Sequence, residues 1–161
     1  MALNRHGLRR FTDDVDILVT PDALKTIHER LVGLGYLPPH GKSKHLRDTE
    51  LGVRIEFLTT GDYPGDGKPK PVAFPDPADV SVHIDDISVV NLETLFEVKI
   101  ASGKSNILRQ KDLGDAVELI KILKLPRSFG SKLSPYVQEE FYRYWDANAT
   151  ANEPNDWEIS Q

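Results

Sequence analysis

The 161-residue chain contains no cysteine and a single methionine. The absence of cysteine excludes disulfide bonds and thiolate metal sites, and it is compatible with the reducing cytosol. No apolar run approaches the roughly 18 residues needed to cross a bilayer. No basic segment followed by an apolar one opens the chain, so we expect no signal peptide. The sequence therefore predicts a cytoplasmic protein without a membrane contact.

Positive charge is also scarce, because 20 lysine and arginine residues stand against 25 aspartate and glutamate residues. The formal charge of −5 argues against binding nucleic acid by overall attraction to phosphate. Two local groups of cations, in segments 4–10 and 104–111, leave contact with RNA or a nucleotide open. The alternative interpretation of both groups is solvated surface.

The chain is long enough for one domain with a sizeable core. Apolar periodicity and turn residues indicate its secondary structure. We expect strands at 14–20, 36–37, 45–49, 53–58, 80–84 and 87–90, and helices at 21–34, 91–103, 113–125 and 133–145. Strands come early and helices late, which predicts an α+β (mixed α/β) fold with a central mixed sheet flanked by helices and a helical C-terminal part.

Short-range signals mark the ends of these elements. Thr20 and Asn91 are suited to be helix N-caps, and Gly35 and Gly103 are suited to end helices. The segment 61–77 is rich in glycine and proline, which predicts a long loop. Loops of this length inside a compact domain tend to be functional or disordered.

Two acids stand at the start of the first expected strand. Asp14 and Asp16 project to the same face of a strand, whereas Val15, Ile17 and Val19 project to the opposite face, toward a core. Neighbouring carboxylates repel each other and lose hydration where the face is partly covered. A cation between them removes that cost, and oxygen ligands at this spacing suit Mg²⁺ or Mn²⁺.

A third acid, Glu56, lies on the expected strand 53–58. Alternation places Ile55 and Phe57 on the core face and Glu56 on the opposite face, which it can share with Asp14 and Asp16. We therefore predict Asp14, Asp16 and Glu56 as catalytic residues and metal ligands. The alternative is that these acids face solvent, with Glu56 paired to Arg54 or a lysine.

The ordered motifs resemble the nucleotidyltransferase superfamily, which has the fold of DNA polymerase β and kanamycin nucleotidyltransferase. The resemblance rests on Arg10-x-Thr12-x-Asp14-x-Asp16 before an apolar strand, on Asn4-Arg5-His6-Gly7 before that motif, on Glu56 in the place of the third carboxylate, and on Leu92 to Lys99 and Arg109 to Asp115, the second with a Lys-Asp-x-x-Asp pattern. Together these motifs cover about residues 2–124. Within the superfamily the chain looks most like minimal bacterial members related to toxins of type IV abortive-infection systems.

The resemblance implies a metal-dependent enzyme that moves a nucleoside monophosphate from a nucleoside triphosphate to a hydroxyl of RNA or protein. Asp14 and Asp16 would hold two divalent cations, Mg²⁺ or Mn²⁺, on the triphosphate, and Glu56 would complete the site and assist deprotonation of the acceptor. Contacts with the nucleotide would come from Arg10, Thr12, Lys99 and Lys111. The resemblance further implies a toxin of a toxin–antitoxin or phage-defence system, with a cognate antitoxin as partner.

The resemblance is incomplete at the start of the motif set. The family opens on a strand and a Gly-Gly or Gly-Ser turn whose backbone N–H groups receive phosphate, and we find neither before Asp14. Two alternatives follow: a catalytically impaired protein of this fold that acts as a binding or regulatory partner, and a phosphohydrolase that uses the same acids. A sheet edge left open by a missing first strand also favours a homodimer.

The remaining patterns divide the chain and leave one alternative open. We expect a nucleotidyltransferase-like domain at 1–125, a C-terminal helix packed on it at 126–148, and a flexible tail at 149–161. Lys111, Asp112 and Asp115 have helical spacing, so they also fit a purely structural role in which Asp112 orders Lys99 or an arginine. The five histidines show no metal-ligand spacing.

Overall fold

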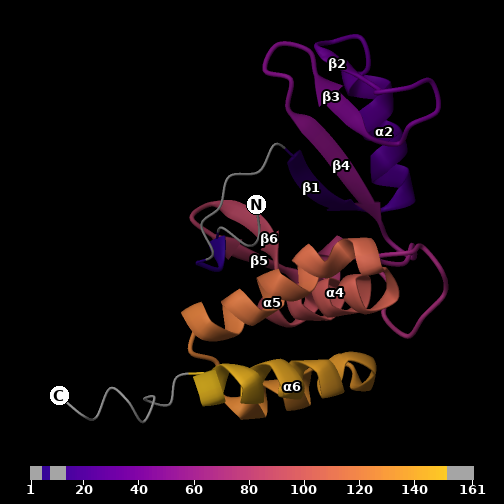
Figure 1. Ribbon diagram of the computed structural model, residues 1–161. Helices are drawn as coiled ribbons and strands as arrows, with labels where there is room; N and C mark the ends of the chain where they lie inside the picture. The colour runs from indigo at the N-terminus through magenta and orange to yellow at the C-terminus, as the bar shows by residue number, and fades with distance from the viewer. Residues whose placement is uncertain (1–4, 8–13, 152–161) are drawn as a thin grey trace.

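The computed structural model describes residues 5–7 and 14–151, and it confirms the α+β class (Figure 1). A four-stranded sheet with α2 lies at one end of the molecule, and α4, α5 and α6 lie at the other (Figure 1). The elements are β1 (Asp14–Val19), α2 (Pro21–Leu31), β2 (Tyr36–Leu37), β3 (Leu46–Asp48), β4 (Arg54–Thr59), α3 (Pro77–Val80), β5 (Ser81–Ile84), β6 (Ile87–Val90), α4 (Leu92–Ser105), η1 (Ile107–Arg109), α5 (Gln110–Ile122), η2 (Arg127–Lys132) and α6 (Pro135–Ala151).

The larger sheet is mixed, with strand order β1-β4-β3-β2. Its β1 and β4 run parallel, whereas β3 is antiparallel to both β4 and β2. Strand β1 is therefore an edge strand, and no other strand of the described residues pairs with its outer side. Strands β5 and β6 form a separate antiparallel hairpin.

A small core fills the space between this sheet and α2. Val19, Leu46 and Phe57 are buried there, and α2 contributes partly buried leucine and isoleucine side chains. The expectation that Val15 and Ile17 would also enter the core was wrong for Ile17, which is 38% exposed, while Val15 is only half-buried. The reason is the edge position of β1, whose outer side is paired with no other strand of the described residues.

The main core lies between the C-terminal helices rather than against the four-stranded sheet. Phe96 of α4, Phe129 of η2 and Phe141 of α6 meet with ring centroids 5.4 to 5.6 Å apart. Around them pack buried aliphatic residues of α4, α5 and α6. Aromatic contacts of this kind hold the three helices together and so fix α4, which carries one wall of the pocket.

The predicted N-caps are confirmed, but the predicted glycine helix ends are wrong. Thr20 Oγ1 accepts a hydrogen bond from the Ala23 N–H (3.2 Å), and Asn91 Oδ1 accepts one from the Thr94 N–H (2.8 Å). Helix α2 ends at Leu31, before Gly35, and α4 continues through Gly103 to Ser105. Glycine is needed inside α4 for packing, because a Cβ at position 103 would overlap the Leu113 side chain of α5.

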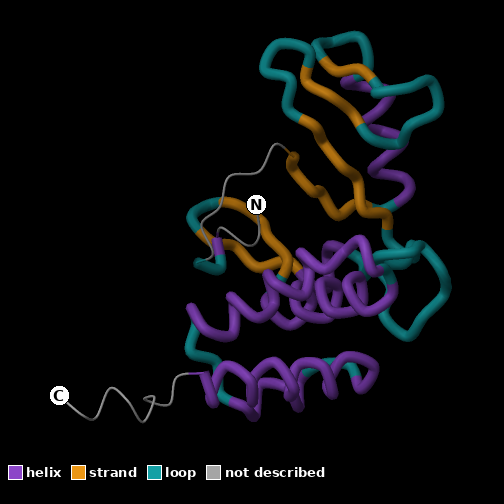
Figure 2. Tube along the Cα trace, in the orientation of Figure 1, coloured by secondary structure: helices purple, strands orange, loops and turns teal. Residues whose placement is uncertain are grey.

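The C-terminal helix is also longer than the sequence suggested. Helix α6 reaches Ala151, so the expected tail at 149–161 is helical over its first three residues, and residues 152–161 lie outside the described chain. Residues 60–76 contain no helix or strand, as expected, and form the loop that Figure 2 shows in teal between β4 and α3. None of the helices described for residues 5–7 and 14–151 is long and apolar enough to cross a membrane.

Candidate functional site

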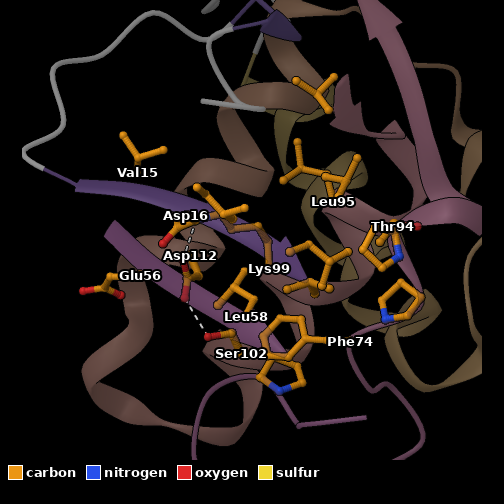
Figure 3. Close-up of a pocket in the computed structure, with 18 of the residues that line it drawn as sticks. Val15, Asp16, Glu56, Leu58, Phe74, Thr94, Leu95, Lys99, Ser102 and Asp112 are labelled. Carbon is orange, nitrogen blue, oxygen red and sulfur yellow. Dashed lines mark hydrogen bonds and ion pairs between the residues drawn. The ribbon is translucent and has the colours of Figure 1, made fainter. Parts of the chain in front are cut away.

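A pocket of about 680 Å³ lies between the open face of β1 and β4 and helix α4. Asp16, Glu56 and Asp112 lie toward one end, and Phe74 and Leu95 toward the other (Figure 3). The loop 60–76 and the β5–β6 hairpin supply the remaining walls. The pocket therefore has a charged end and an apolar end.

The parallel register of β1 and β4 builds the acidic wall. Asp16 is the Cα partner of Glu56, and Asp14 is the partner of Arg54. Because side chains alternate along a strand, Asp14, Asp16 and Glu56 belong to one face of the sheet. Asp16 and Glu56 line the pocket. Asp14, which lies two residues before Asp16 on β1 and is half-buried, does not.

The charged form of Asp16 is disfavoured in this acidic wall. Burial raises the pKa of Asp16, and repulsion from Glu56 and Asp14 raises it further, while Lys99 lowers it. The Asp16 side chain keeps contact with solvent inside the pocket, which limits the desolvation. Repulsion from Glu56 and Asp14 adds to the desolvation of Asp16, and a cation at this end of the pocket would relieve both.

The same wall limits how a metal ion can be held. Within residues 5–7 and 14–151, no group of three or more histidine, aspartate or glutamate side chains is arranged to hold a metal ion. The described residues therefore form no protein-only metal cage. Nucleotide-bound Mg²⁺ typically uses one or two carboxylates together with phosphate oxygens and water. The donor pair Asp16 and Glu56 fits that shared mode of binding.

Lys99 faces the acids from α4 and is held by an ion-pair network. Its Nζ lies 2.7 Å from Asp112 Oδ1 and 2.9 Å from Asp115 Oδ2, and Ser102 Oγ donates to Asp112 Oδ2 at 2.6 Å. Burial by itself lowers the pKa of Lys99, but Asp112 and Asp115 outweigh it and leave that pKa above the ordinary lysine value. The structure thus bears out the interpretation that Asp112 orders Lys99.

Of the other residues predicted to contact the nucleotide, only Lys111 belongs to the described structure. Lys111 is exposed and absent from the lining. Arg10 and Thr12 lie outside the described residues. The alternative pairing of Glu56 with Arg54 or a lysine is not formed among the described side chains, where Glu56 makes no ion pair.

The lining also contains residues that were not predicted as site residues, among them Ser102, Arg109 and Asp112. Arg109 opens the segment that holds the Lys-Asp-x-x-Asp pattern, so its place two residues before Lys111 was an available signal. Ser102 carries no signal of its own, because its role depends on Asp112 of the next helix.

The loop 60–76 is a packed wall of the pocket. Lys70 Nζ, whose side chain is 6% exposed, donates to the Pro64 and Lys68 carbonyls at 2.8 Å each and lies 2.7 Å from Asp66 Oδ1. Gly65, at a φ of +80°, approaches α4 so closely that a Cβ would lie 2.6 Å from the Ser102 carbonyl oxygen. These contacts fix Pro64 and Gly65 beside the charged residues of α4.

Comparison with known proteins returns nothing: no protein-family model, no curated protein and no solved structure matches the chain. The comparisons therefore place the chain in no family, and its resemblance to the nucleotidyltransferases stays a prediction from its own residues.

Proposed function

We propose that the pocket binds a nucleoside triphosphate and that the protein transfers the nucleoside monophosphate to a hydroxyl acceptor on RNA or protein. The observation that carries the proposal is the register that sets Asp16 opposite Glu56 at the charged end of the pocket. Lys99 faces these acids from another element, so carboxylates and a cation meet around one space. This combination suits phosphate chemistry that needs a metal ion.

The size and charge of the pocket support a nucleotide together with divalent cations. A volume of about 680 Å³ falls within the usual range for small-molecule sites. Three lining residues are acids (Asp16, Glu56 and Asp112) and two are cations (Lys99 and Arg109). A triphosphate adds several negative charges to this lining, so its binding requires added positive charge. We therefore expect binding to depend on Mg²⁺ or Mn²⁺.

The acidic residues would have two roles in the transfer, metal binding and proton acceptance. Asp16 and Glu56, with Asp14 beside them on the sheet face, would hold the cations; when bound, these neutralise the phosphate charge and polarise the α-phosphorus. The acceptor hydroxyl oxygen forms a bond to the α-phosphorus as the bond from that phosphorus to the pyrophosphate oxygen breaks. The hydroxyl proton passes to the Glu56 carboxylate, and pyrophosphate leaves.

A second candidate function is nucleotide binding without turnover, in a binding or regulatory partner. It is favoured by the finding that the described residues form no three-ligand metal group. Under this alternative the charged end of the pocket would still take a nucleotide, but transfer would be lost. The proposed toxin role and the antitoxin partner rest on the sequence resemblance alone.

The test combines binding with transfer. The parent chain, Asp16→Asn, Glu56→Gln and the exposed control Glu118→Gln are each given α-³²P-labelled ATP, GTP, CTP and UTP with Mg²⁺, Mn²⁺ or EDTA, together with total RNA or protein extract as acceptor. We expect metal-dependent labelling of an acceptor that falls about 100-fold or more in both site variants and is unchanged in Glu118→Gln.

Three other outcomes would change this conclusion. Metal-dependent binding without labelling favours the regulatory partner, and release of nucleoside monophosphate without labelling favours a phosphohydrolase. Equal nucleotide binding by the parent and both site variants contradicts the proposal.

A further inference from the structure

We infer that Arg109, rather than Lys99 or Lys111, is the residue that contacts the phosphate chain of the ligand. The inference rests on the proposed function and assigns a residue within that same site. It follows from how the charge of each cation near the pocket is already used in the structure.

The charge of Lys99 is already used in ion pairs that join α4 to α5. Its Nζ is paired with both Asp112 and Asp115 at 2.7 and 2.9 Å, and all three side chains are at most 17% exposed. One cation and two carboxylates leave this cluster with an excess of negative charge. A phosphate that replaced one of the acids would leave that acid buried without its cation, which is costly. Lys99 therefore suits holding α4 to α5 better than binding the ligand.

Arg109 is the second cation of the lining and its charge is available. Arg109 is an exposed residue of the pocket lining and forms no ion pair within residues 5–7 and 14–151. Lys111, two positions later, is exposed but does not line the pocket. Among the described lysines and arginines, only Arg109 both lines the pocket and lacks an ion pair.

The backbone of Arg109 is held in place by hydrogen bonds of the turn that precedes α5. The Arg109 N–H donates to the Asn106 carbonyl (2.8 Å), and Asn106 Oδ1 accepts from the Leu108 N–H (2.9 Å). Gly103 lets this turn approach α4, because a Cβ there would lie 3.1 Å from the Arg109 carbonyl oxygen. The turn therefore fixes the base of the arginine beside the pocket.

The chemistry of the guanidinium matches the task. It carries five N–H donors in a planar fork that can bind two phosphate oxygens at once, and it stays charged at all working pH values. Asp16 and Glu56 approach from the sheet, whereas Arg109 approaches from the helical side. A phosphate chain in the pocket would therefore be held between carboxylate-bound cations on one wall and a guanidinium on the other.

The test measures how affinity depends on the number of phosphates. The α,β-methylene analogues of ATP, GTP, CTP and UTP, and the matching monophosphates, are titrated with Mg²⁺ into the parent, Arg109→Met, Arg109→Lys and Lys111→Met by calorimetry. Lys121→Met, which removes an exposed charge elsewhere on α5, is the control.

We expect Arg109→Met to weaken triphosphate binding about 10- to 100-fold and monophosphate binding much less. Arg109→Lys should recover part of the loss, and Lys121→Met should bind as the parent does. Thermal midpoints within a few degrees of the parent show that each variant is folded, which the exposure of Arg109 favours.

Two results overturn the inference, and they differ in what they mean for the proposed function. If the parent binds the triphosphate analogues and Arg109→Met binds them equally well, or if the loss appears in Lys111→Met instead, the assignment of Arg109 is wrong while the function stands. If the parent binds no triphosphate analogue, both the assignment and the proposed function are wrong.

Discussion

The Nζ atom of Lys99 lies 2.7 Å from Oδ1 of Asp112, and this ion pair joins α4 to α5 at the wall of the pocket. Asp115 adds a second contact at 2.9 Å, and Ser102 binds the far oxygen of Asp112. Ion pairs buried to this degree are sensitive to the loss of one partner, because the remaining charge stays in a poorly hydrated place. The network is therefore a clear target for stability measurements.

Replacing Lys99 by methionine is expected to lower the free energy of unfolding by about 3 kcal/mol, because Asp112 and Asp115 lose their common cation. Urea unfolding followed by circular dichroism measures the change. The exposed control Lys121→Met should change stability by less than about 0.5 kcal/mol. A loss below about 1 kcal/mol in Lys99→Met would show that the network contributes little.

The same network makes stability fall in alkaline solution. Burial lowers the pKa of Lys99, but Asp112 and Asp115 raise it more, so the folded lysine keeps its proton above the ordinary value of 10.5. The stabilisation is fully present below 10.5 and is lost as the pH rises through the folded pKa. The free energy of unfolding should therefore fall more steeply above pH 10.5 in the parent than in Lys99→Met. Equal slopes in urea titrations between pH 9 and 11.5 would contradict this.

Asp16→Asn is expected to stabilise the protein at neutral pH and, under the proposed function, to abolish metal-dependent transfer. The folded pKa of Asp16 is raised by burial, Glu56 and Asp14, so the ionised form opposes folding. The penalty is absent below the unfolded pKa and grows as the pH rises through the folded one. The gain should be less than about 1 kcal/mol, because solvent screens the repulsion. A melting-temperature gain at pH 7 that disappears near pH 3.5 is expected; a loss of stability at pH 7 would contradict it.

Gly65→Ala is expected to destabilise the pocket wall more than Gly67→Ala does. Both glycines have positive φ angles, +80° and +72°, so both variants carry a similar backbone strain of about 1 kcal/mol. Only at Gly65 does the added Cβ also meet backbone, the Ser102 carbonyl oxygen, together with Ser105 Oγ. We expect the Gly65 variant to lose at least about 1 kcal/mol more by urea unfolding. Equal losses would show that the loop shifts without cost.

The β5–β6 turn should be improved by Asp86→Gly. Asp85 and Asp86 have φ angles of +48° and +62°, and they form a two-residue turn that glycine at the second position adopts more easily. Asp85 is left in place because its carboxylate lies 2.7 Å from Arg5. A gain of about 0.5 to 1 kcal/mol is expected in thermal unfolding. A decrease would indicate an unrecognised role for the Asp86 side chain.

Features that depend on neighbours along the chain could be predicted, and features that depend on distant segments could not. Thr20 and Asn91 were predicted as N-caps because a capping bond reaches only two or three residues ahead. Gly103 was misassigned because its use is set by α5, which packs against it. Ile17 was misassigned for a similar reason, since alternation gives its face but not whether another layer covers that face.

The candidate site divides in the same way. The sequence by itself determined that Asp14 and Asp16 share a strand face and that Glu56 lies on the polar side of its own strand, because alternation is a local property of an extended chain. Only the tertiary structure decided that Asp16 lies opposite Glu56 on the neighbouring strand, since the register of two strands depends on the elements between them. It also decided that Lys99 is held by Asp112 while Arg109 keeps an open charge, because those contacts join residues of different helical segments.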